Sequence, residues 1–244
     1  MSERIAKTVA RAGICSRREA ERLIDQGRVR VNGTTLTSPA LNVTAEDRIE
    51  IDGKPLPVPE TARLFRFHKP VGVLTAERDP QERRTIYDVL PSLPGHPRVM
   101  PVGRLDLNTE GLLLLTNDGE LKRSLEHPAN KWARQYRVRV RGKVDPKKLE
   151  DLKDGIVVEN IHYGSIKAQI EKTGTTNTWL QIGMQEGKNR EIRKVMGALG
   201  LQVNRLIRTA YGPFLLDGLL PGQAEEIAPE QIRKLDQRSE GLSS

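Results

Sequence analysis

The sequence predicts an α+β protein with two domains: a small N-terminal domain of helices and short strands, and a larger one built on a mixed, mainly antiparallel β-sheet. Strand-like and helix-like patterns alternate irregularly, with many hairpin-like turns between them. No glycine-rich phosphate loop follows a strand-like segment, which argues against a parallel nucleotide-binding sheet. Residues 54–60 contain three prolines, which is typical of a stiff linker. We therefore expect domains at 1–56 and 63–228, a linker at 57–62 and a C-terminal tail at 229–244.

The amino-acid composition indicates which kind of molecule the protein binds. The net charge is +8 and the isoelectric point is near 9.7, which favours a polyanion such as nucleic acid. Aromatic residues are only 4% of the chain, which disfavours a single-strand binder built on repeated stacking platforms. One cysteine and four scattered histidines match no disulfide or metal-ligand spacing, so no metal is expected. The sequence has neither an apolar run of about 18 residues nor a secretory signal, so we expect no membrane contact and a cytoplasmic protein.

Two helices and a strand pair make up the predicted N-terminal domain. Residues 3–12 form an amphipathic pattern that ends at Gly13, and Ser16 with Glu19 forms a capping box that opens a second helix to about Gln26. Alternating strands then lead into Asn-Gly and Asp-Gly turns at residues 32–33 and 52–53.

Basic charge concentrates on these two helices and the following turn. Between residues 31 and 60 the balance reverses, with two basic residues against five acidic ones. Such an arginine cluster suits phosphate contacts, although a solvated helix face has the same appearance. The candidate phosphate ligands are Arg17, Arg18, Arg22 and Arg28.

The second domain opens with an alternating strand at 63–68 and a Lys69-Pro70-Val71-Gly72 turn, followed by a short helical segment near 86–90. Leu112–Leu115, closed by Thr116, predicts a buried strand. Asn117 and Glu120 suggest a capping box for a helix to about residue 126.

Alternation begins again at Tyr136. Tyr136, Val138 and Val140 would share one face of a strand, and Arg137, Arg139 and Arg141 the other. Asp145-Pro146 opens a predicted helix over 144–154, and strands follow to residue 182. A basic loop at 185–190 then opens a helix at 191–199 that ends at Gly200, and 201–211 is again strand-like. This region holds a second basic patch, composed of Lys188, Arg190, Arg193, Lys194, Arg205 and Arg208. Beyond Pro229 we expect one or two amphipathic turns and a polar tail.

Asp106 stands on a glycine-punctuated loop directly before the leucine strand. A buried strand is a rigid base on which a charged loop can carry chemistry. Taken alone, an aspartate in this position is more often a solvated turn residue.

The N-terminal domain resembles the alpha-L RNA-binding domain found in a small-subunit ribosomal protein, in tyrosyl-tRNA synthetases and in several rRNA-modifying enzymes. Three segments carry the resemblance: Ala10-Arg11-Ala12-Gly13, Ser16-Arg17-Arg18-Glu19-Ala20 and Gly27-Arg28-Val29-Arg30-Val31-Asn32-Gly33. It implies that the arginine-rich helical face binds structured RNA.

Four elements of the second domain, in this order, resemble the ribosomal RNA pseudouridine synthases of the small-subunit synthase A type. They are Lys69-Pro70-Val71-Gly72, Gly103-Arg104-Leu105-Asp106 with its leucine strand, Tyr136 at the head of its strand, and Glu186-Gly187-Lys188-Asn189-Arg190-Glu191-Ile192-Arg193. The loop 103–109 is closer to the large-subunit synthase B type. The resemblance implies a monomer with a pseudouridine synthase fold that converts a uridine of ribosomal RNA, with 23S rRNA favoured, to pseudouridine without a cofactor.

The resemblance also implies roles for single residues. Asp106 is the catalytic carboxylate, and attack on the ribose or base and removal of the C2′ proton both remain open for it. Arg193 keeps it charged, or else binds phosphate from the helix surface. Tyr136 stacks on a flipped-out base, or else belongs to the core. Arg104 follows phosphates or fills the gap that the base leaves. The remaining RNA contacts would come from Lys69, Lys188, Arg190 and Arg205.

Two other functions fit the same sequence. A non-catalytic rRNA-binding or ribosome-assembly factor could use the same scaffold. A uridine glycosidase would release free uracil.

Overall fold

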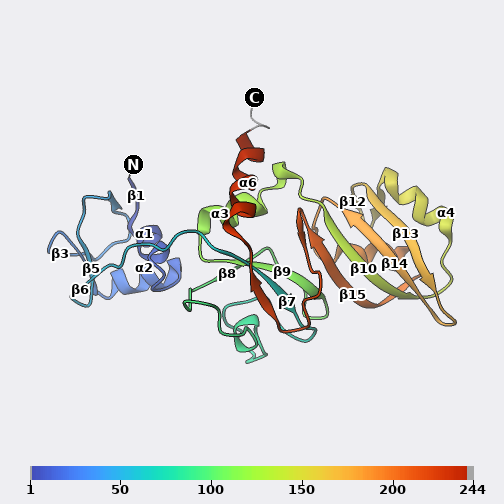
Figure 1. Cartoon of the computed structure of the whole chain (residues 1–244), viewed down its shortest axis with the longest axis horizontal. Helices are drawn as coiled ribbons and strands as arrows, with labels where there is room; N and C mark the ends of the chain where they lie inside the picture. The colour runs from blue at the N-terminus through green and yellow to red at the C-terminus, as the bar shows by residue number, and fades with distance from the viewer. Residues whose placement is uncertain (1, 241–244) are drawn as a thin grey trace. The chain divides into compact units, whose positions relative to one another are not determined.

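A computed structural model describes residues 2–240 and confirms the α+β class, with short helices and a mainly antiparallel sheet (Figure 1). The described chain packs as two compact units. Unit 1 runs to Arg63 and adds Leu93–Met100 and Thr116–Leu121, and unit 2 holds the remainder. Unit 1 thus includes two segments that follow the proline-rich stretch in sequence. The predicted domain boundaries themselves stay predictions.

Unit 1 contains the two expected helices, α1 and α2, and short strands. Ser16 accepts a hydrogen bond from the Glu19 amide and so caps α2, as predicted. Strands β3-β2-β5-β6 form one small sheet in that order, and β1 pairs with β4. The buried core includes Ile5, Val9 and Ile24. The elements are β1 (Glu3–Arg4), α1 (Ile5–Arg11), α2 (Arg17–Asp25), β2 (Val29–Val31), β3 (Thr34–Thr35), β4 (Asn42–Val43), β5 (Ile49–Ile51) and β6 (Lys54–Pro55).

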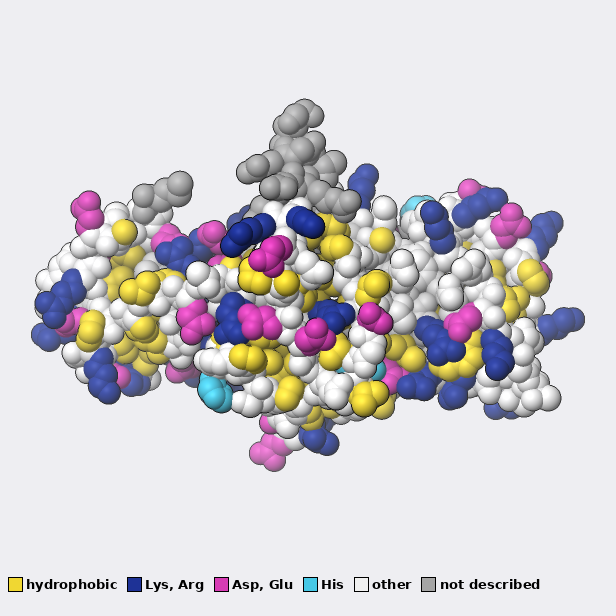
Figure 2. Space-filling model, viewed as in Figure 1, with side chains coloured by type: hydrophobic (Ala, Val, Ile, Leu, Met, Phe, Trp, Pro, Cys, Tyr) yellow, Lys and Arg dark blue, Asp and Glu magenta, His cyan; other side chains and the backbone are white. Residues whose placement is uncertain are grey.

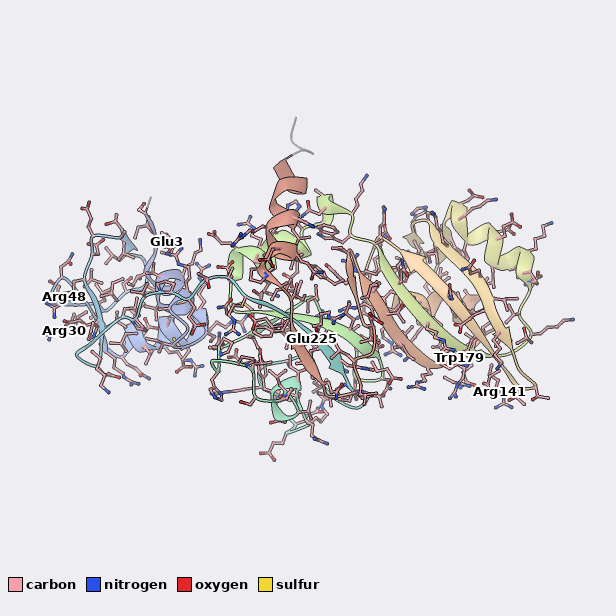
Figure 3. All side chains as sticks on the ribbon, in the orientation of Figure 1. Glu3, Arg30, Arg48, Arg141, Trp179 and Glu225 are labelled. Carbon is pink, nitrogen blue, oxygen red and sulfur yellow. The ribbon has the colours of Figure 1, made fainter. Side chains whose placement is uncertain are left out.

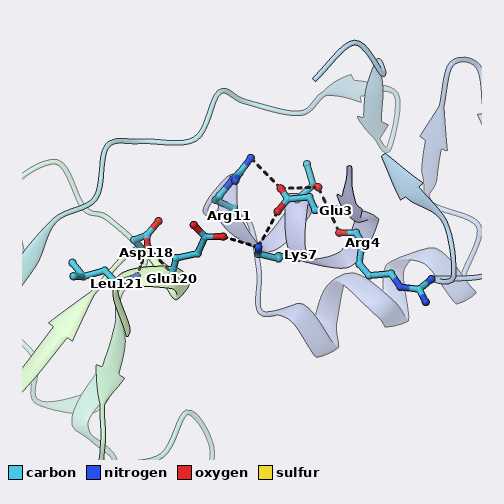
Figure 4. A network of polar contacts seen from close by, with 8 residues as sticks. Glu3, Arg4, Lys7, Arg11, Asp118, Glu120 and Leu121 are labelled. Atoms are coloured by element: carbon cyan, nitrogen blue, oxygen red, sulfur yellow. Dashed lines mark hydrogen bonds and ion pairs between the residues drawn. The ribbon is translucent and has the colours of Figure 1, made fainter. Parts of the chain in front are cut away.

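Ion pairs on α1 form a small network within unit 1 (Figure 4). Glu3 contacts both Lys7 and Arg11, and the Lys7 Nζ atom is also 2.7 Å from Glu120. Such exposed pairs stabilise a protein by about 0 to 1 kcal/mol each.

Helix α3 (Gly119–Glu126) begins differently from the prediction. Asp118, not Asn117, accepts hydrogen bonds from the amides of Glu120 and Leu121. Asn117 instead bonds the backbone of Thr61 and Arg63 through its side-chain amide. Asp118 caps the helix in place of the predicted Asn117, because the Asn117 side chain forms hydrogen bonds with a segment more than fifty positions earlier.

Unit 2 is built on a nine-stranded sheet with the main order β13-β14-β10-β15-β9-β7-β17. Strand β16 pairs with β15, and β8 pairs with β9. Its elements are β7 (Leu64–Lys69), η1 (Ile86–Asp88), β8 (Met100–Val102), β9 (Glu110–Thr116), η2 (Pro128–Asn130), β10 (Arg134–Arg141), α4 (Pro146–Asp151), η3 (Leu152–Asp154), β11 (Ile156–Val158), β12 (Ile161–Tyr163), β13 (Ile166–Thr173), β14 (Asn177–Met184), α5 (Glu191–Ala198), β15 (Gln202–Tyr211), β16 (Phe214–Leu215), β17 (Ala224–Glu226) and α6 (Pro229–Glu240).

The strand β9 is buried along its whole length, as the leucine run predicted.

Strand β10 alternates between apolar and basic side chains from Tyr136 onward, as expected. Val138 and Val140 on one of its faces join a core with Leu149 of α4 and Val195 of α5, so both helices cover that face of the sheet. The opposite face of β10 carries arginines. Asp145 caps α4 through the Lys147 amide, also as predicted.

The C-terminal element is longer than expected. We predicted one or two turns after Pro229, whereas α6 runs from Pro229 to Glu240 and buries Ile232 and Leu235. The polar tail that we predicted falls partly on residues 241–244, which lie outside the described residues. Among the residues described, no helix is both long and apolar enough to cross a membrane.

At Gly111, strand β9 pairs in parallel with β15, opposite Arg208. Its φ angle is +105°, a region that favours glycine. A Cβ atom at this position would lie 2.3 Å from the Arg208 carbonyl oxygen and 2.7 Å from its backbone nitrogen. Only glycine allows the two strands to approach this closely.

We predict that Gly111→Ala lowers the free energy of unfolding by roughly 2 to 4 kcal/mol, because backbone atoms cannot move away without breaking the strand pairing. Urea unfolding measures the change. Gly197→Ala is the matched control, since Gly197 lies in α5 and a Cβ atom added there would meet open space. The control should gain about 0.5 to 1 kcal/mol. Equal stability of the two variants would contradict the prediction.

Candidate active site

Residues 105–109, here called the Asp106 loop, lead directly into β9. Each of their five backbone carbonyls accepts a hydrogen bond from another part of the chain. The donors are Thr75 Oγ1 to Leu105 (2.9 Å), Lys69 Nζ to Asp106 (3.2 Å) and to Thr109 (2.9 Å), Gly72 N to Leu107 (2.8 Å) and Arg193 Nη2 to Asn108 (2.7 Å). A loop with every carbonyl occupied has little freedom to change its backbone conformation.

Lys69 is the largest single contributor to this anchoring. Its side chain is fully buried at the end of β7, and its three hydrogen bonds go to carbonyl oxygens, the third being that of Pro70 at 3.0 Å. Burial lowers the pKa of Lys69 to about 8, against the opposing charges of Asp106 and Glu110. We predicted an RNA contact for Lys69, and this was wrong, because an ammonium with no exposed surface cannot reach a phosphate.

Asp106 itself keeps about a third of its side chain exposed, and its Oδ2 atom lies 3.8 Å from Nη1 of Arg190. Arg190 stands at the start of α5 with a left-handed backbone, φ 50°. The guanidinium therefore places a positive charge beside the carboxylate. The structure thus corrects the predicted partner, since Arg190 rather than Arg193 makes the ion pair with Asp106.

Arg193 acts on the loop backbone instead. Its guanidinium donates to the carbonyls of Asn108 and Val203, and its Nε atom is buried without a partner among the described residues. Burial is the main cause that lowers its pKa, with Arg190 adding to the effect and Asp106 opposing it. Arg193 therefore lies within electrostatic reach of the carboxylate but makes its hydrogen bonds to carbonyls.

The basic loop before α5 is held in place by several hydrogen bonds. The Lys188 amide donates to the Glu191 carboxylate at 2.7 Å, and burial raises the pKa of Glu191. The Lys188 ammonium bonds Glu186 at 2.5 Å and the His162 carbonyl at 2.9 Å. Arg134 from β10 donates to the carbonyls of residues 185 and 186. Lys188 remains exposed, so its predicted RNA contact is compatible with this geometry.

Tyr136 lies half-buried on β10, opposite Ile182 of β14 and Arg208 of β15. It packs against the core cluster, and its exposed part leaves the stacking role open. Arg208 beside it is only 3% exposed, donates to the Leu112 carbonyl at 2.7 Å and lies over the Tyr211 ring. Burial lowers its pKa while Tyr136 opposes the shift. Arg208 is therefore an interior residue and no part of a surface patch.

Other predicted RNA contacts lie on the surface. Arg104 is exposed and makes no ion pair with the described residues. Arg205 pairs with Glu110 at 2.6 Å but keeps nearly half of its side chain exposed. The N-terminal arginines Arg17, Arg18, Arg22 and Arg28 are all exposed, and three of them pair with carboxylates on their own unit.

Sequence reasoning missed three residues that shape the site: Thr75, Glu110 and Arg134. Glu110 had a usable signal, because an acidic residue that begins a fully apolar strand needs a cationic partner. Thr75 and Arg134 had none, since their hydrogen bonds go to backbone atoms of distant segments. No group of three His, Cys, Asp or Glu side chains that could hold a metal occurs in the described part of the chain.

We predict that Lys69 makes the stability of this protein depend on pH above 8. The folded pKa near 8 lies below the ordinary value of 10.5, so between these values the unfolded chain binds more protons and the free energy of unfolding rises with pH. Relative to Lys69→Met, the wild type should gain on the order of 1 to 3 kcal/mol across this window.

Urea unfolding at stepped pH measures the difference. Lys153→Met, at an exposed lysine, is the control and should follow the wild-type profile. Parallel profiles for wild type and Lys69→Met would show that the lysine titrates normally.

Comparison with known proteins identifies the family. Residues 63–198 match the model described as RNA pseudouridylate synthase, and residues 3–49 match that of the S4 domain. The chain is 44% identical over 232 residues to an uncharacterised RNA pseudouridine synthase of Rickettsia felis, covering 95% of this chain and 100% of that protein. It is 43% identical over 226 residues to ribosomal large subunit pseudouridine synthase B of Salmonella typhi, covering 91% of this chain and 77% of that protein.

A solved structure gives the same result. The crystal structure of a pseudouridylate synthase superposes with a TM-score of 0.65 and 27% identity, covering 95% of this chain and 99% of that chain. Both resemblances inferred from the motifs are thereby confirmed, including that of the RNA-binding module at the N-terminus. The chain belongs to the RNA pseudouridylate synthase family and carries an S4 domain ahead of the synthase domain.

Proposed function

We propose that this protein converts a specific uridine of ribosomal RNA to pseudouridine, and that the target lies in the 23S rRNA of the large subunit. The similarity to ribosomal large subunit pseudouridine synthase B supports the choice of rRNA and subunit. We also propose that the protein acts as a cytoplasmic monomer without a cofactor, as expected from its sequence.

The observation that carries this proposal is the anchoring of the Asp106 loop. The side chain of Asp106 makes an ion pair with Arg190 at the start of α5, while all five loop carbonyls are occupied. A carboxylate that is ion-paired on an anchored backbone and still about one third exposed can meet a substrate in a fixed geometry.

The reaction is an isomerisation, so the atoms balance without a co-reactant. The bond between N1 of uracil and C1′ of ribose breaks, the base turns, and C5 bonds to C1′. The proton lost from C5 is matched by the one gained at N1. In this proposal the Asp106 carboxylate acts on the ribose or the base, either as a nucleophile or as the base that removes the C2′ proton. Arg190 places its guanidinium beside the carboxylate and helps to orient it for either role.

The target base has to leave the RNA stack to reach Asp106. Tyr136 supplies the aromatic surface for it, and stacking of this kind is worth roughly 1 to 3 kcal/mol. Exposed cations supply affinity that is independent of sequence, among them Arg104, Lys188, Arg205 and the arginines of the S4 domain.

The two alternatives make different predictions about products. A ribosome-assembly factor would bind rRNA and leave its uridines unchanged, whereas a uridine glycosidase would release uracil. The membership of the synthase family and the presence of Asp106, Tyr136 and Arg193 in one chain favour the isomerase.

We predict that Asp106→Asn forms no pseudouridine and binds rRNA within about threefold of wild type, because it removes the reactive oxygen and leaves the loop anchors in place. Pseudouridine mapping of rRNA from cells with and without the protein gives the site, and filter binding gives the affinity. Wild-type rates in Asp106→Asn would exclude Asp106 as the catalytic residue. If no site disappears on deletion of the gene, the isomerase proposal fails.

The variants Arg190→Gln and Arg193→Gln should distinguish the effect of the ion pair with Asp106 from the effect of anchoring the loop backbone. Arg193→Gln removes the donor to the Asn108 carbonyl, and a displaced loop should lower kcat on the order of 100-fold at every pH. Arg190→Gln removes the ion pair with Asp106 but leaves the loop carbonyls anchored, so its loss of kcat should be smaller than that of Arg193→Gln. Single-turnover rates from pH 5 to 8 measure both, with Lys153→Gln as the control. Equal losses in the two variants would contradict this division.

A further inference from the structure

Strand β10 presents a second functional surface on its other side. Because side chains alternate along a strand, Arg137, Arg139 and Arg141 point away from the face that α4 and α5 cover. Tyr136 lies on the covered face. The arginines therefore lie on the opposite face of the strand from Tyr136, the proposed stacking residue.

The registers of the neighbouring strands place further groups beside these arginines. Trp179 of β14 and Arg205 of β15 are the direct partners of Arg139, and Lys172 of β13 is the next partner of Trp179. One row of side chains thus crosses four strands. We call the surface composed of Arg137, Arg139, Arg141, Lys172, Trp179 and Arg205 the outer sheet face.

Trp179 is one of only two tryptophans in the chain, and it lies half-buried in the middle of this basic surface. The guanidinium of Arg137 is 4.3 Å from the centre of its ring, and that of Arg139 is 5.8 Å away. Figure 3 labels Trp179 and Arg141 among the side chains that project from these strands. The surface therefore combines an aromatic ring with guanidinium groups close beside it.

Positive charge on this face is only partly compensated. Glu171 binds Arg137 at 2.7 Å, and Glu110 binds Arg205 at 2.6 Å. Arg139 and Arg141 have no ion pair with the described residues, and the Nε atom of Arg139 is buried without a partner. In the space-filling view, Lys and Arg side chains gather around hydrophobic ones at this end of the sheet (Figure 2). Two arginines without an ion pair among the described residues therefore lie on the same face as Trp179.

We propose that the outer sheet face binds a segment of the RNA substrate remote from the target uridine. Phosphates contact Arg139, Arg141, Lys172 and Arg205, and an unpaired nucleotide lies against Trp179. RNA is favoured over a protein because the face combines planar cations with one aromatic ring and lacks the aliphatic patch that protein interfaces bury. The inference rests on the proposed function, since it requires an RNA longer than the target loop.

Binding of protein-free 23S rRNA by the full chain, measured from 50 to 300 mM salt, tests the proposal. Arg139→Gln/Arg141→Gln should weaken binding about tenfold near 150 mM salt and reduce the slope of log Kd against log salt by about 1 to 2. Trp179→Ala should weaken binding between about 5-fold and 100-fold. Lys147→Gln/Lys148→Gln removes the same charge from the exposed side of α4, over the covered face, and should change Kd by less than about twofold.

Equal losses in the two double variants would overturn the proposal, as would no loss in either. Arg141→Glu, at an exposed position, serves as a second variant if the double variant does not fold, and it should weaken binding at least as much as Arg139→Gln/Arg141→Gln. Pseudouridine formation is scored separately. If wild type forms none and the variants still lose affinity, the proposed function fails and the outer sheet face stands. If the wild type forms pseudouridine and the variants bind RNA with unchanged affinity, the proposed function stands and the outer sheet face proposal fails.

Discussion

Hydrogen bonds from four separate places, β7, the turn after it, Thr75 and helix α5, converge on the five carbonyl oxygens of the Asp106 loop. Carbonyls that point into a protein have to be satisfied, and here side chains and a backbone amide from distant segments do so. These hydrogen bonds fix the position of Asp106 relative to α5 and to the sheet. The rest of the site depends on that position. Arg190 can pair with the carboxylate because Arg193, one turn later, holds the same loop.

Burying the cations that hold these carbonyls has a cost. Lys69 and Arg208 are almost wholly enclosed, and neither forms an ion pair with the described residues. Each is stabilised by carbonyl oxygens or aromatic rings instead, and the lowered pKa of both groups reflects the lost hydration. A neutral side chain of the same size would be easier to bury but would leave the carbonyls of the loop or of β9 without donors.

Strand β10 organises the synthase domain on both of its sides. Its apolar positions carry the core with α4 and α5, and Tyr136 at its head belongs to that same face. Its arginines form the outer sheet face together with Trp179. Arg134, at its first position, reaches the loop before α5. A single eight-residue strand therefore connects the core, the candidate base-stacking residue and a separate basic surface.

Much of the fold follows from local patterns in the sequence alone. Ser16 and Asp145 cap their helices, the leucine run forms a buried strand, and the alternation from Tyr136 forms a two-faced strand, because each of these depends on residues a few positions apart. The motifs also identified the family correctly, since they record chemistry that only a few residue types can perform.

Tertiary structure alone decided which charges are buried and what each one bonds. The local sequence around Lys69 and Arg208 does not distinguish them from cations on the surface. The packing of β7 and β15 against β9 is what buries them. Arg190, the N-cap residue of α5, and Arg193, in its first turn, lie three positions apart, and which of them meets Asp106 depends on how α5 packs against a loop about 85 residues earlier. Hydrogen bonds from side chains to backbone carbonyls leave no pattern in the sequence, because every residue type carries the same carbonyl group.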